Sequence, residues 1–290
     1  MGIRQAYTAV TRVTIREAMI SRRQLLILSP LLCLPPAARS MPPADFVLVQ
    51  AGALPIILTA PHGGRMAVPD VAPRVIPDQP SDGTSFVVDF DPETDRLALG
   101  IAARIKALIK RDVYLVVAHF NRKYIDANRP PRIAFDQPAA RPYYDFYHQS
   151  IRRAVDEMRA RHRHGLLIDV HGQHKIPDAL VRGTINGRAV RRLLARAGVA
   201  AVTGPEGLFG QLERNGFRVF PDNNVPPAGR NEDAGFSGGY TTNLYGSHRA
   251  DGIDAVQFEF GIQYRRKATI DGAIEGAAKA IVAFHDKYLK

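Results

Sequence analysis

Four clusters of polar residues follow or end apolar runs, and their residue types could carry out a metal-assisted hydrolysis. The clusters are His62, the segment Asp126–Arg129, His171 and Glu259. Two histidines and one carboxylate, with a fourth position left open, are typical protein ligands of a catalytic zinc ion. A separate carboxylate beside the metal can remove a proton from water while the metal polarises the scissile carbonyl group. Together, the four clusters therefore indicate a hydrolytic zinc site.

Two of these clusters contain residues that could support the ligands or the substrate. Asp169 precedes His171 by two residues, and a carboxylate that accepts a hydrogen bond from a ligand histidine fixes the orientation of its ring. Asn128 and Arg129 present planar amide and guanidinium groups, which suit a substrate carboxylate. Arg122, a few residues earlier, could help to neutralise an acidic substrate. We therefore expect Asp169 to orient His171, and the three others to bind substrate.

The elements that position these residues alternate between strands and helices. Apolar runs predict strands over 53–59, 113–118, 166–170, 217–220 and 254–260. Helical spacing of apolar residues predicts helices over 91–110, 143–162, 187–197, 205–215 and 269–288. Such alternation favours an α/β domain with a mostly parallel, mixed sheet and helices on both faces. Because ligands bind at the carboxyl ends of parallel strands, the polar clusters are expected to converge there.

The first 40 residues have the pattern of an export signal rather than of a folded domain. Arg22 and Arg23 precede a short apolar run, and small residues follow near Ser40. The paired arginines suggest twin-arginine export to the periplasm or the exterior of a bacterium. The apolar run is shorter than the ~20 residues of a membrane span, so no stable membrane anchor is expected. Residues 41–290 are predicted to form a single enzymatic domain, with Met1 and Met19 both possible start sites.

Composition narrows the class of partner. The formal net charge is +11, and part of this excess lies in the signal segment, so the remaining chain is moderately basic. Such a balance fits an anionic substrate. We find no zinc-finger spacing, RNA-binding aromatic signature or long basic run, so nucleic acid is not an expected partner. The single cysteine, Cys33, lies in the signal segment. The basic helix expected over 187–197 is interpreted as a solvated face.

Seven short motifs of polar residues and glycines follow one another along the chain. They are Pro61-His-Gly-Gly64, Asp91-x-x-x-Asp95-x-Leu97, Asp126-Ala-Asn-Arg129, Tyr147-His148, Asp169-Val-His-Gly172, Gly238-Gly-Tyr240 and Gln257-Phe-Glu259. In this order they resemble the motifs of the N-formylglutamate amidohydrolase family, and the resemblance spans about residues 55–264. More remotely, the chain is similar to the zinc carboxypeptidases, which implies their phosphorylase/hydrolase-like fold.

The resemblance implies roles for these residues. It makes His62 and His171 zinc ligands, Glu259 the general base, and Asn128 with Arg129 the substrate clamp. One zinc ion per chain is expected.

The third metal ligand is less clear from the sequence. Carboxypeptidases carry a glutamate three residues after the first histidine, where this chain has Arg65. The resembling family implies Asp91 instead. However, an aspartate followed by Pro92 is also a typical helix N-cap, and Glu93 could be the ligand in that case.

The resulting hypothesis is a zinc-dependent hydrolase of a C–N amide bond. Its substrate would be a small N-acyl amino acid or an acidic peptide. An envelope metallopeptidase that cuts peptidoglycan stem peptides or poly-glutamate is the alternative, with the Pro-rich loop 68–80 bordering its groove. A secreted, non-catalytic binding protein on the same scaffold is a second alternative. The sequence leaves the acyl group and the oligomeric state open.

Overall fold

The computed structural model describes residues 42–75, 86–233 and 235–290, which form a single α/β domain. The export signal expected over residues 1–40 lies outside the described residues, as does part of the loop 68–80. None of the helices in the described ranges is both long enough and apolar enough to cross a membrane.

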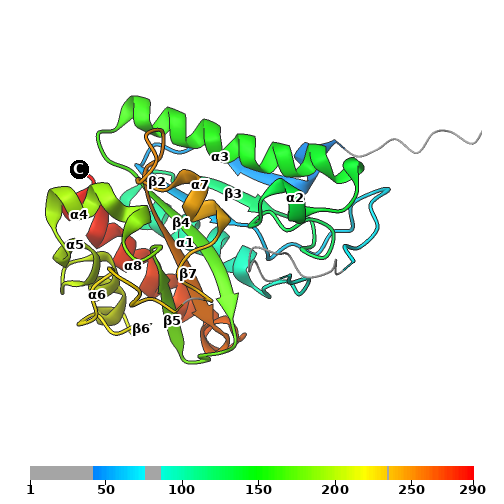
Figure 1. Cartoon of the computed structure of the whole chain (residues 1–290). Helices are drawn as coiled ribbons and strands as arrows, with labels where there is room; N and C mark the ends of the chain where they lie inside the picture. The colour runs from blue at the N-terminus through cyan, green and yellow to red at the C-terminus, as the bar shows by residue number, and fades with distance from the viewer. Residues whose placement is uncertain (1–41, 76–85, 234) are drawn as a thin grey trace, which may run out of the picture. The chain divides into compact units, whose positions relative to one another are not determined.

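Seven strands form one mixed sheet in the order β1-β3-β2-β4-β7-β5-β6 (Figure 1). The four inner strands β3, β2, β4 and β7 are parallel, β1 is antiparallel to β3, and β5 is antiparallel to β7 while β6 runs parallel to β5. The bounds are β1 Val47–Gln50, β2 Ile56–Ala60, β3 Tyr114–Ala118, β4 Leu166–Gln173, β5 Ala179–Gly183, β6 Arg218–Phe220 and β7 Asp254–Gly261. The predicted α/β fold with a mixed sheet is confirmed.

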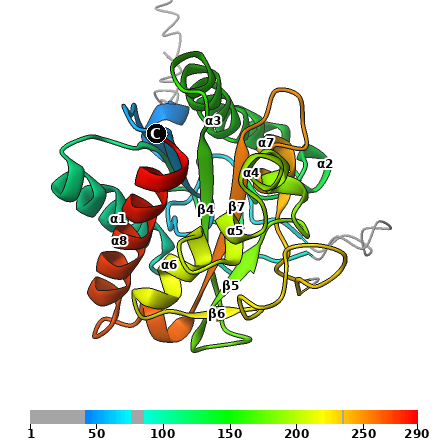
Figure 2. The same ribbon diagram turned by 90° about the vertical axis from the view of Figure 1, so that its left-hand side faces the viewer.

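Helices cover both faces of this sheet (Figure 2). One apolar cluster joins α1, α6 and α8 to one face, and a second joins α3 and α7 to the other. The α-helices are α1 Thr94–Ile109, α2 Pro131–Ala134, α3 Arg141–Arg161, α4 Arg191–Ala197, α5 Ala200–Thr203, α6 Leu208–Arg214, α7 Tyr240–Tyr245 and α8 Ile270–Tyr288. Short 3₁₀ turns lie at η1 Pro43–Phe46, η2 Pro138–Ala140, η3 Arg188–Val190 and η4 Ile262–Arg265.

Strand β4 is longer than predicted, and this changes the position of His171. The strand was expected to end at Val170, but it pairs with β7 over eight residues, up to Gln173. His171 therefore lies within the strand, directly beside Glu259 in the register of the two strands. Because side chains alternate along a strand, Asp169 and His171 share a face, and Glu259 lies on that face too.

Candidate metal centre

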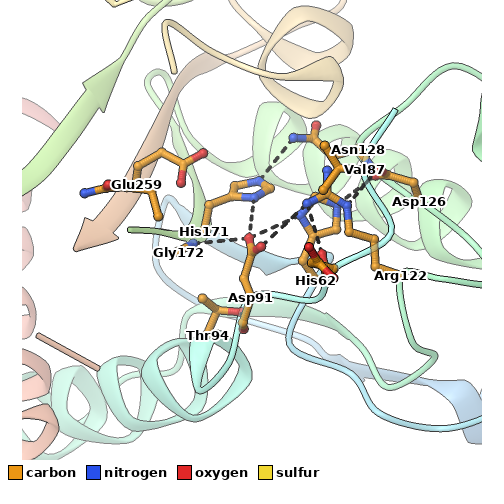
Figure 3. Close-up of polar contacts among 12 residues, drawn as sticks. His62, Val87, Asp91, Thr94, Arg122, Asp126, Asn128, His171, Gly172 and Glu259 are labelled. Carbon is orange, nitrogen blue, oxygen red and sulfur yellow. Dashed lines mark hydrogen bonds and ion pairs between the residues drawn. The ribbon is translucent and has the colours of Figure 1, made fainter. Parts of the chain in front are cut away.

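Three side chains converge at the carboxyl ends of the central strands (Figure 3). His62 follows β2, His171 lies near the end of β4, and Asp91 precedes α1. The Nδ1 atom of each histidine lies 3.3 Å from Oδ2 of Asp91, and one ligand atom from each residue fits within 4.8 Å of the others. A tetrahedral zinc ion with bonds of ~2.0–2.1 Å separates its ligand atoms by ~3.3–3.4 Å. The three side chains could therefore hold a metal ion.

Each histidine is oriented by its own carboxylate. Nε2 of His62 lies 2.7 Å from Oδ1 of Asp126, and Nε2 of His171 lies 2.8 Å from Oδ2 of Asp169. Because an ionised carboxylate only accepts hydrogen bonds, both Nε2 atoms donate, and the Nδ1 atoms of both rings face Asp91 as the nitrogens available to a metal. The structure thus places Asp169 where the sequence predicted it. The equivalent role of Asp126 was not predicted, although its position at a strand end was noted.

Asp91 does not cap the helix, so the N-cap interpretation is wrong. Helix α1 begins at Thr94, whose hydroxyl donates to the backbone carbonyl of Asp91 at 2.9 Å, and no side chain caps the helix. The Glu93 carboxylate instead pairs with Arg65 at 3.1 Å and with Arg96 at 3.7 Å. Of the two candidate third ligands, the geometry favours Asp91.

Arg122 is buried among the carboxylates of the site. Its Nε donates to Asp126 at 2.8 Å, and its Nη1 lies 3.6 Å from Oδ1 of Asp91. Burial alone would raise the pKa of Asp126, but Arg122 and His62 hold it well below its usual value. The same neighbours, with His171, lower the pKa of Asp91 against the effect of burial. Arg122 therefore keeps both carboxylates charged, and its expected contact with substrate stays a prediction.

Asn128 is built into the site. Its Oδ1 accepts a hydrogen bond from the backbone N–H of Thr241 at 2.9 Å, and its Nδ2 lies 3.2 Å from Nε2 of His171. A Cβ atom at Gly239 would lie 2.1 Å from Asn128 Nδ2, so only glycine allows this close approach. The contact explains one glycine of the Gly238-Gly-Tyr240 motif. The hydrogen bond from Thr241 engages Oδ1 of Asn128, which leaves less of the amide for the substrate role expected from the sequence.

Arg129 lies half-buried next to Asn128, and its Nη1 donates to the Asn128 carbonyl at 2.9 Å. Burial lowers the pKa of Arg129, while Asp126, Asp91 and Glu259 raise it. The guanidinium group is therefore close enough to interact electrostatically with the carboxylates of the site. Its predicted contact with a substrate carboxylate remains a prediction.

Glu259 lies beside the three potential ligands without belonging to them (Figure 3). Its side chain is buried, and its Oε1 accepts a hydrogen bond from Nε2 of Gln257 at 2.9 Å. Burial raises the pKa of Glu259 to about 7, with Asp91 adding to the effect and His171 opposing it. A carboxylate with a pKa near neutrality is well matched to general base and acid catalysis.

Arg265 joins the segments that carry these groups, and this role was not predicted from the sequence. The buried guanidinium donates to three backbone carbonyls, those of Pro92 at 2.7 Å, Gln173 at 3.0 Å and Phe260 at 3.1 Å. A Cβ atom at Gly172 would lie 2.6 Å from its Cζ, so this glycine makes room for the guanidinium. Arg265 thus ties the start of α1, the end of β4 and the end of β7 together.

His148, noted in the sequence as part of a Tyr-His pair, supports the loop after β3. Its Nε2 donates to the carbonyl of Ala127 at 3.0 Å, and its Nδ1 lies 3.0 Å from the Tyr245 hydroxyl. Burial lowers the pKa of His148 to about 4. The imidazole is therefore neutral at physiological pH, and it supports the loop through hydrogen bonds rather than through a charge.

The lowered pKa of His148 predicts that part of the free energy of unfolding is lost in acid. Since its pKa is about 4 in the folded chain and ~6.5 when unfolded, the unfolded state binds more protons between these values. This contribution is complete above pH 6.5 and is lost as the pH falls toward 4, by up to ~3 kcal/mol. Urea unfolding from pH 4.5 to 7.5 should show a shallower acid-side decline in His148→Gln. Equal slopes in the two proteins would contradict the assignment.

Loss of an orienting carboxylate should weaken metal binding without removing a ligand. We expect Asp169→Asn to lower zinc affinity by ~10–100-fold, because the amide still accepts a hydrogen bond but no longer carries charge. Competition with a chromogenic chelator measures this affinity. Thr59→Val is the matched control, since it removes only the 2.5 Å hydrogen bond to Asp169. An Asp169→Asn protein with the control's affinity would refute the orienting role.

Comparisons with known proteins confirm the resemblance inferred from the motifs. The model of the N-formylglutamate amidohydrolase family matches residues 134–264, a segment that contains His171 and Glu259. The crystal structure of the N-formylglutamate amidohydrolase from Ralstonia eutropha JMP134 covers 82% of this chain and 97% of its own, with 14% identity and a TM-score of 0.53. No curated protein sequence matches the chain.

Two further solved structures align with most of this chain. The product of an Agrobacterium tumefaciens gene aligns with 83% of this chain and 95% of its own, with 16% identity and a TM-score of 0.50. A bacteriophage poly-gamma-glutamate hydrolase aligns with 83% of this chain and 89% of its own, with 14% identity and a TM-score of 0.40. At these identities, the structural likeness establishes the fold.

Proposed function

We propose that this chain is a zinc-dependent hydrolase of a C–N amide bond, acting on a small N-acyl amino acid or an acidic peptide. The observation that carries the proposal is the set of His62, Asp91 and His171, in which both histidines face one carboxylate oxygen at 3.3 Å. The family match over residues 134–264 supports the reaction class. Export of the chain, expected from residues 1–40, is part of the proposal.

The potential metal site fits zinc by the chemistry of its donors. Two imidazole nitrogens and one carboxylate oxygen leave a fourth tetrahedral position open. A zinc ion at this place would supply a Lewis acid that polarises the amide carbonyl and makes a water molecule more acidic.

In this proposal, Glu259 transfers a proton from the attacking water to the leaving amine. Its carboxylate takes a proton from the attacking water and later gives it to the amine that leaves. The pKa of about 7, raised by burial, suits both transfers, because the group exchanges a proton readily near neutral pH. The hydrogen bond from Gln257 holds one carboxylate oxygen, and the other remains available to water.

Arg129 is proposed to bind the carboxylate of the substrate. It lies beside Asn128 in the loop after β3 and is less buried than Arg122, which pairs with two carboxylates of the site. A guanidinium group can bind a carboxylate through two parallel hydrogen bonds. A substrate that carries a carboxylate is thus favoured over an uncharged amide. No observation on the described residues favours the envelope peptidase or the non-catalytic alternative.

Arg129→Lys should separate substrate binding from chemistry. Lysine keeps the charge but loses the two-pronged geometry, so we expect a higher KM for acidic substrates with zinc content unchanged. Steady-state kinetics on an N-acyl glutamate and on its uncharged amide analogue measure the difference. The uncharged analogue should be almost insensitive to the change. An equal loss on both substrates would assign Arg129 to the stability of the loop.

The whole proposal is tested by metal analysis of the purified chain together with an amidase screen over N-formyl and N-acyl amino acids. We expect one zinc per chain and hydrolysis that a chelator abolishes and zinc restores. A chain that holds zinc but hydrolyses none of these amides would reject the substrate class. A chain that binds no divalent metal would reject the mechanism.

A further inference from the structure

A polar cavity lies at the amino ends of the central strands, whereas the candidate metal centre lies at their carboxyl ends. Its volume is about 110 Å³, and it opens where β4 and β7 begin. Basic residues from the end of α3, from the loop that follows and from α4 dominate its lining, namely Arg159, His162, Arg163, His164, Arg192 and Arg196. The sequence predicted the basic helix over 187–197 as a solvated face, and Arg188, Arg191 and Arg192 are indeed exposed. Two of its arginines, Arg192 and Arg196, also line this cavity.

Positive charge is in excess in this cavity, which we call the basic pocket. Four arginines line it, and Asp254 is the one acidic residue of the lining. Asp254 is already engaged, since it pairs with Nη1 of Arg196 at 2.7 Å and accepts the backbone N–H of Leu193 at 3.0 Å. Burial lowers the pKa of His164, and the nearby Arg196 and Arg163 lower it further. Among the described residues that line the pocket, four arginines thus face a single carboxylate, which leaves a net positive charge.

Two of the arginines are fixed in place by the backbone. Arg192 donates to the carbonyls of Gly252 at 2.8 Å and Ala250 at 2.8 Å. Arg159 donates to the carbonyls of Asp251 at 3.1 Å and Ala250 at 3.2 Å. These bonds hold the guanidinium groups against the backbone of the turn, and the one carboxylate of that turn, Asp251, pairs with Arg152 outside the pocket. Both therefore contribute a preorganised field to the pocket.

Two further polar atoms of the pocket are buried without a partner. They are Nη2 of Arg196 and Nε2 of His162, which have no hydrogen-bond partner among the described residues. Arg163 is exposed and His164 is half-buried, and neither side chain forms a hydrogen bond or ion pair with another described residue. Basic residues at the end of α3 are explained in part by the helix dipole. The dipole does not explain buried donors without acceptors, which are rare and costly in native proteins.

We propose that the basic pocket binds a phosphate-type oxyanion. Donors that reach the pocket from α4 and from the loop after α3 suit a tetrahedral anion with several acceptor oxygens better than a planar carboxylate. The uncompensated charge favours a dianion. The cavity of about 110 Å³ has room for a few water molecules, which is the size of one phosphate group. The ligand would supply the missing acceptors to Arg196, His162 and Arg163.

The basic pocket is separate from the candidate metal centre. Asp254 in the pocket and Glu259 at the metal centre lie five residues apart along β7, which corresponds to roughly 17 Å. An anion in the pocket therefore makes no direct contact with the amide substrate. Variants of the pocket should leave the basal hydrolytic activity unchanged.

Titration of the purified chain with inorganic phosphate at constant ionic strength, followed by calorimetry, tests the proposal. We expect saturable binding of one phosphate, with sulfate competing for it. Arg163→Gln should weaken binding by about tenfold or more, since it removes a charge-assisted hydrogen bond. Arg153→Gln is the matched control, because it removes the same charge from an exposed position on α3 outside the pocket. His162→Gln provides a second pocket variant that keeps a donor.

A second experiment identifies the source of the phosphate group. The chain would bind a lipid headgroup if it co-sediments with vesicles of phosphatidylglycerol but not with vesicles of phosphatidylcholine. Arg163→Gln should then abolish the co-sedimentation. Phosphate binding without co-sedimentation would assign a soluble phosphate compound, and also supports the site. The proposal fails if phosphate shows no saturable binding, or if Arg163→Gln and Arg153→Gln bind it equally.

Discussion

Glu259→Gln is expected to lower kcat by ~10²–10⁴ while fold and zinc content stay unchanged. Glutamine keeps the size of the side chain and can still bond to Gln257, but it cannot accept a proton from water at neutral pH. The measurement is the turnover of an N-acyl amino acid, with zinc determined on the same sample and folding followed by circular dichroism. The loss should fall on kcat rather than on substrate binding.

Glu93→Gln is the matched control for this experiment. It removes the same charge from a nearby carboxylate that pairs with Arg65 and Arg96 instead of facing the site. Its turnover should match that of the unmodified chain. Undiminished turnover in Glu259→Gln would remove the proposed mechanism. Loss of zinc in Glu259→Gln would make Glu259 a metal ligand instead of a base.

His171→Ala should abolish stoichiometric zinc binding and, with it, hydrolysis. The substitution removes one of three ligand atoms that lie within 4.8 Å of one another, and it leaves Asp169 without its partner. Asp91→Ala should also reduce zinc affinity, by more than the ~10–100-fold expected for an orienting carboxylate. Atomic emission analysis after dialysis against a weak chelator gives the metal content of each protein.

The pair Asp91→Ala and Glu93→Ala distinguishes the two carboxylates that the sequence left as alternatives. We expect Glu93→Ala to retain zinc, because its carboxylate pairs with two arginines on the surface side of the helix start. If Glu93→Ala is the variant that loses zinc, the third ligand is misassigned. Full zinc content in His171→Ala would reject the whole site.

The buried strands were predictable because apolar runs in a parallel sheet are nearly continuous. The runs that became β2, β3, β4 and β7 were all located, with ends shifted by up to three residues. The edge strand β1 has only four residues, three of them not buried, so its pattern is weak. Strand β5 contains Arg182, a charge that hides its apolar character in the sequence even though the side chain is fully buried.

The candidate site was predictable where a residue stands next to its partner in the sequence. Asp169 and His171 are two positions apart on one strand, so their contact follows from strand geometry. The contact of Asp126 with His62 depends on the order of the strands, because β3 lies beside β2 in the sheet. Neither spacing nor residue type carries that information. Arg265 was also missed. All its acceptors are backbone carbonyls, which every residue type carries, so the sequence holds no signal for these contacts.

The three carbonyls held by Arg265 have a consequence for the order in which the protein is made. Asp91, His171 and Glu259 come from early, middle and late parts of the chain, and the guanidinium that ties their segments together comes later still. A growing polypeptide that already contains both histidines still lacks the strand and the arginine that set their spacing. We therefore expect the site to form only after Arg265 has been synthesised, so that a nascent chain that stops before this residue cannot present a finished active centre.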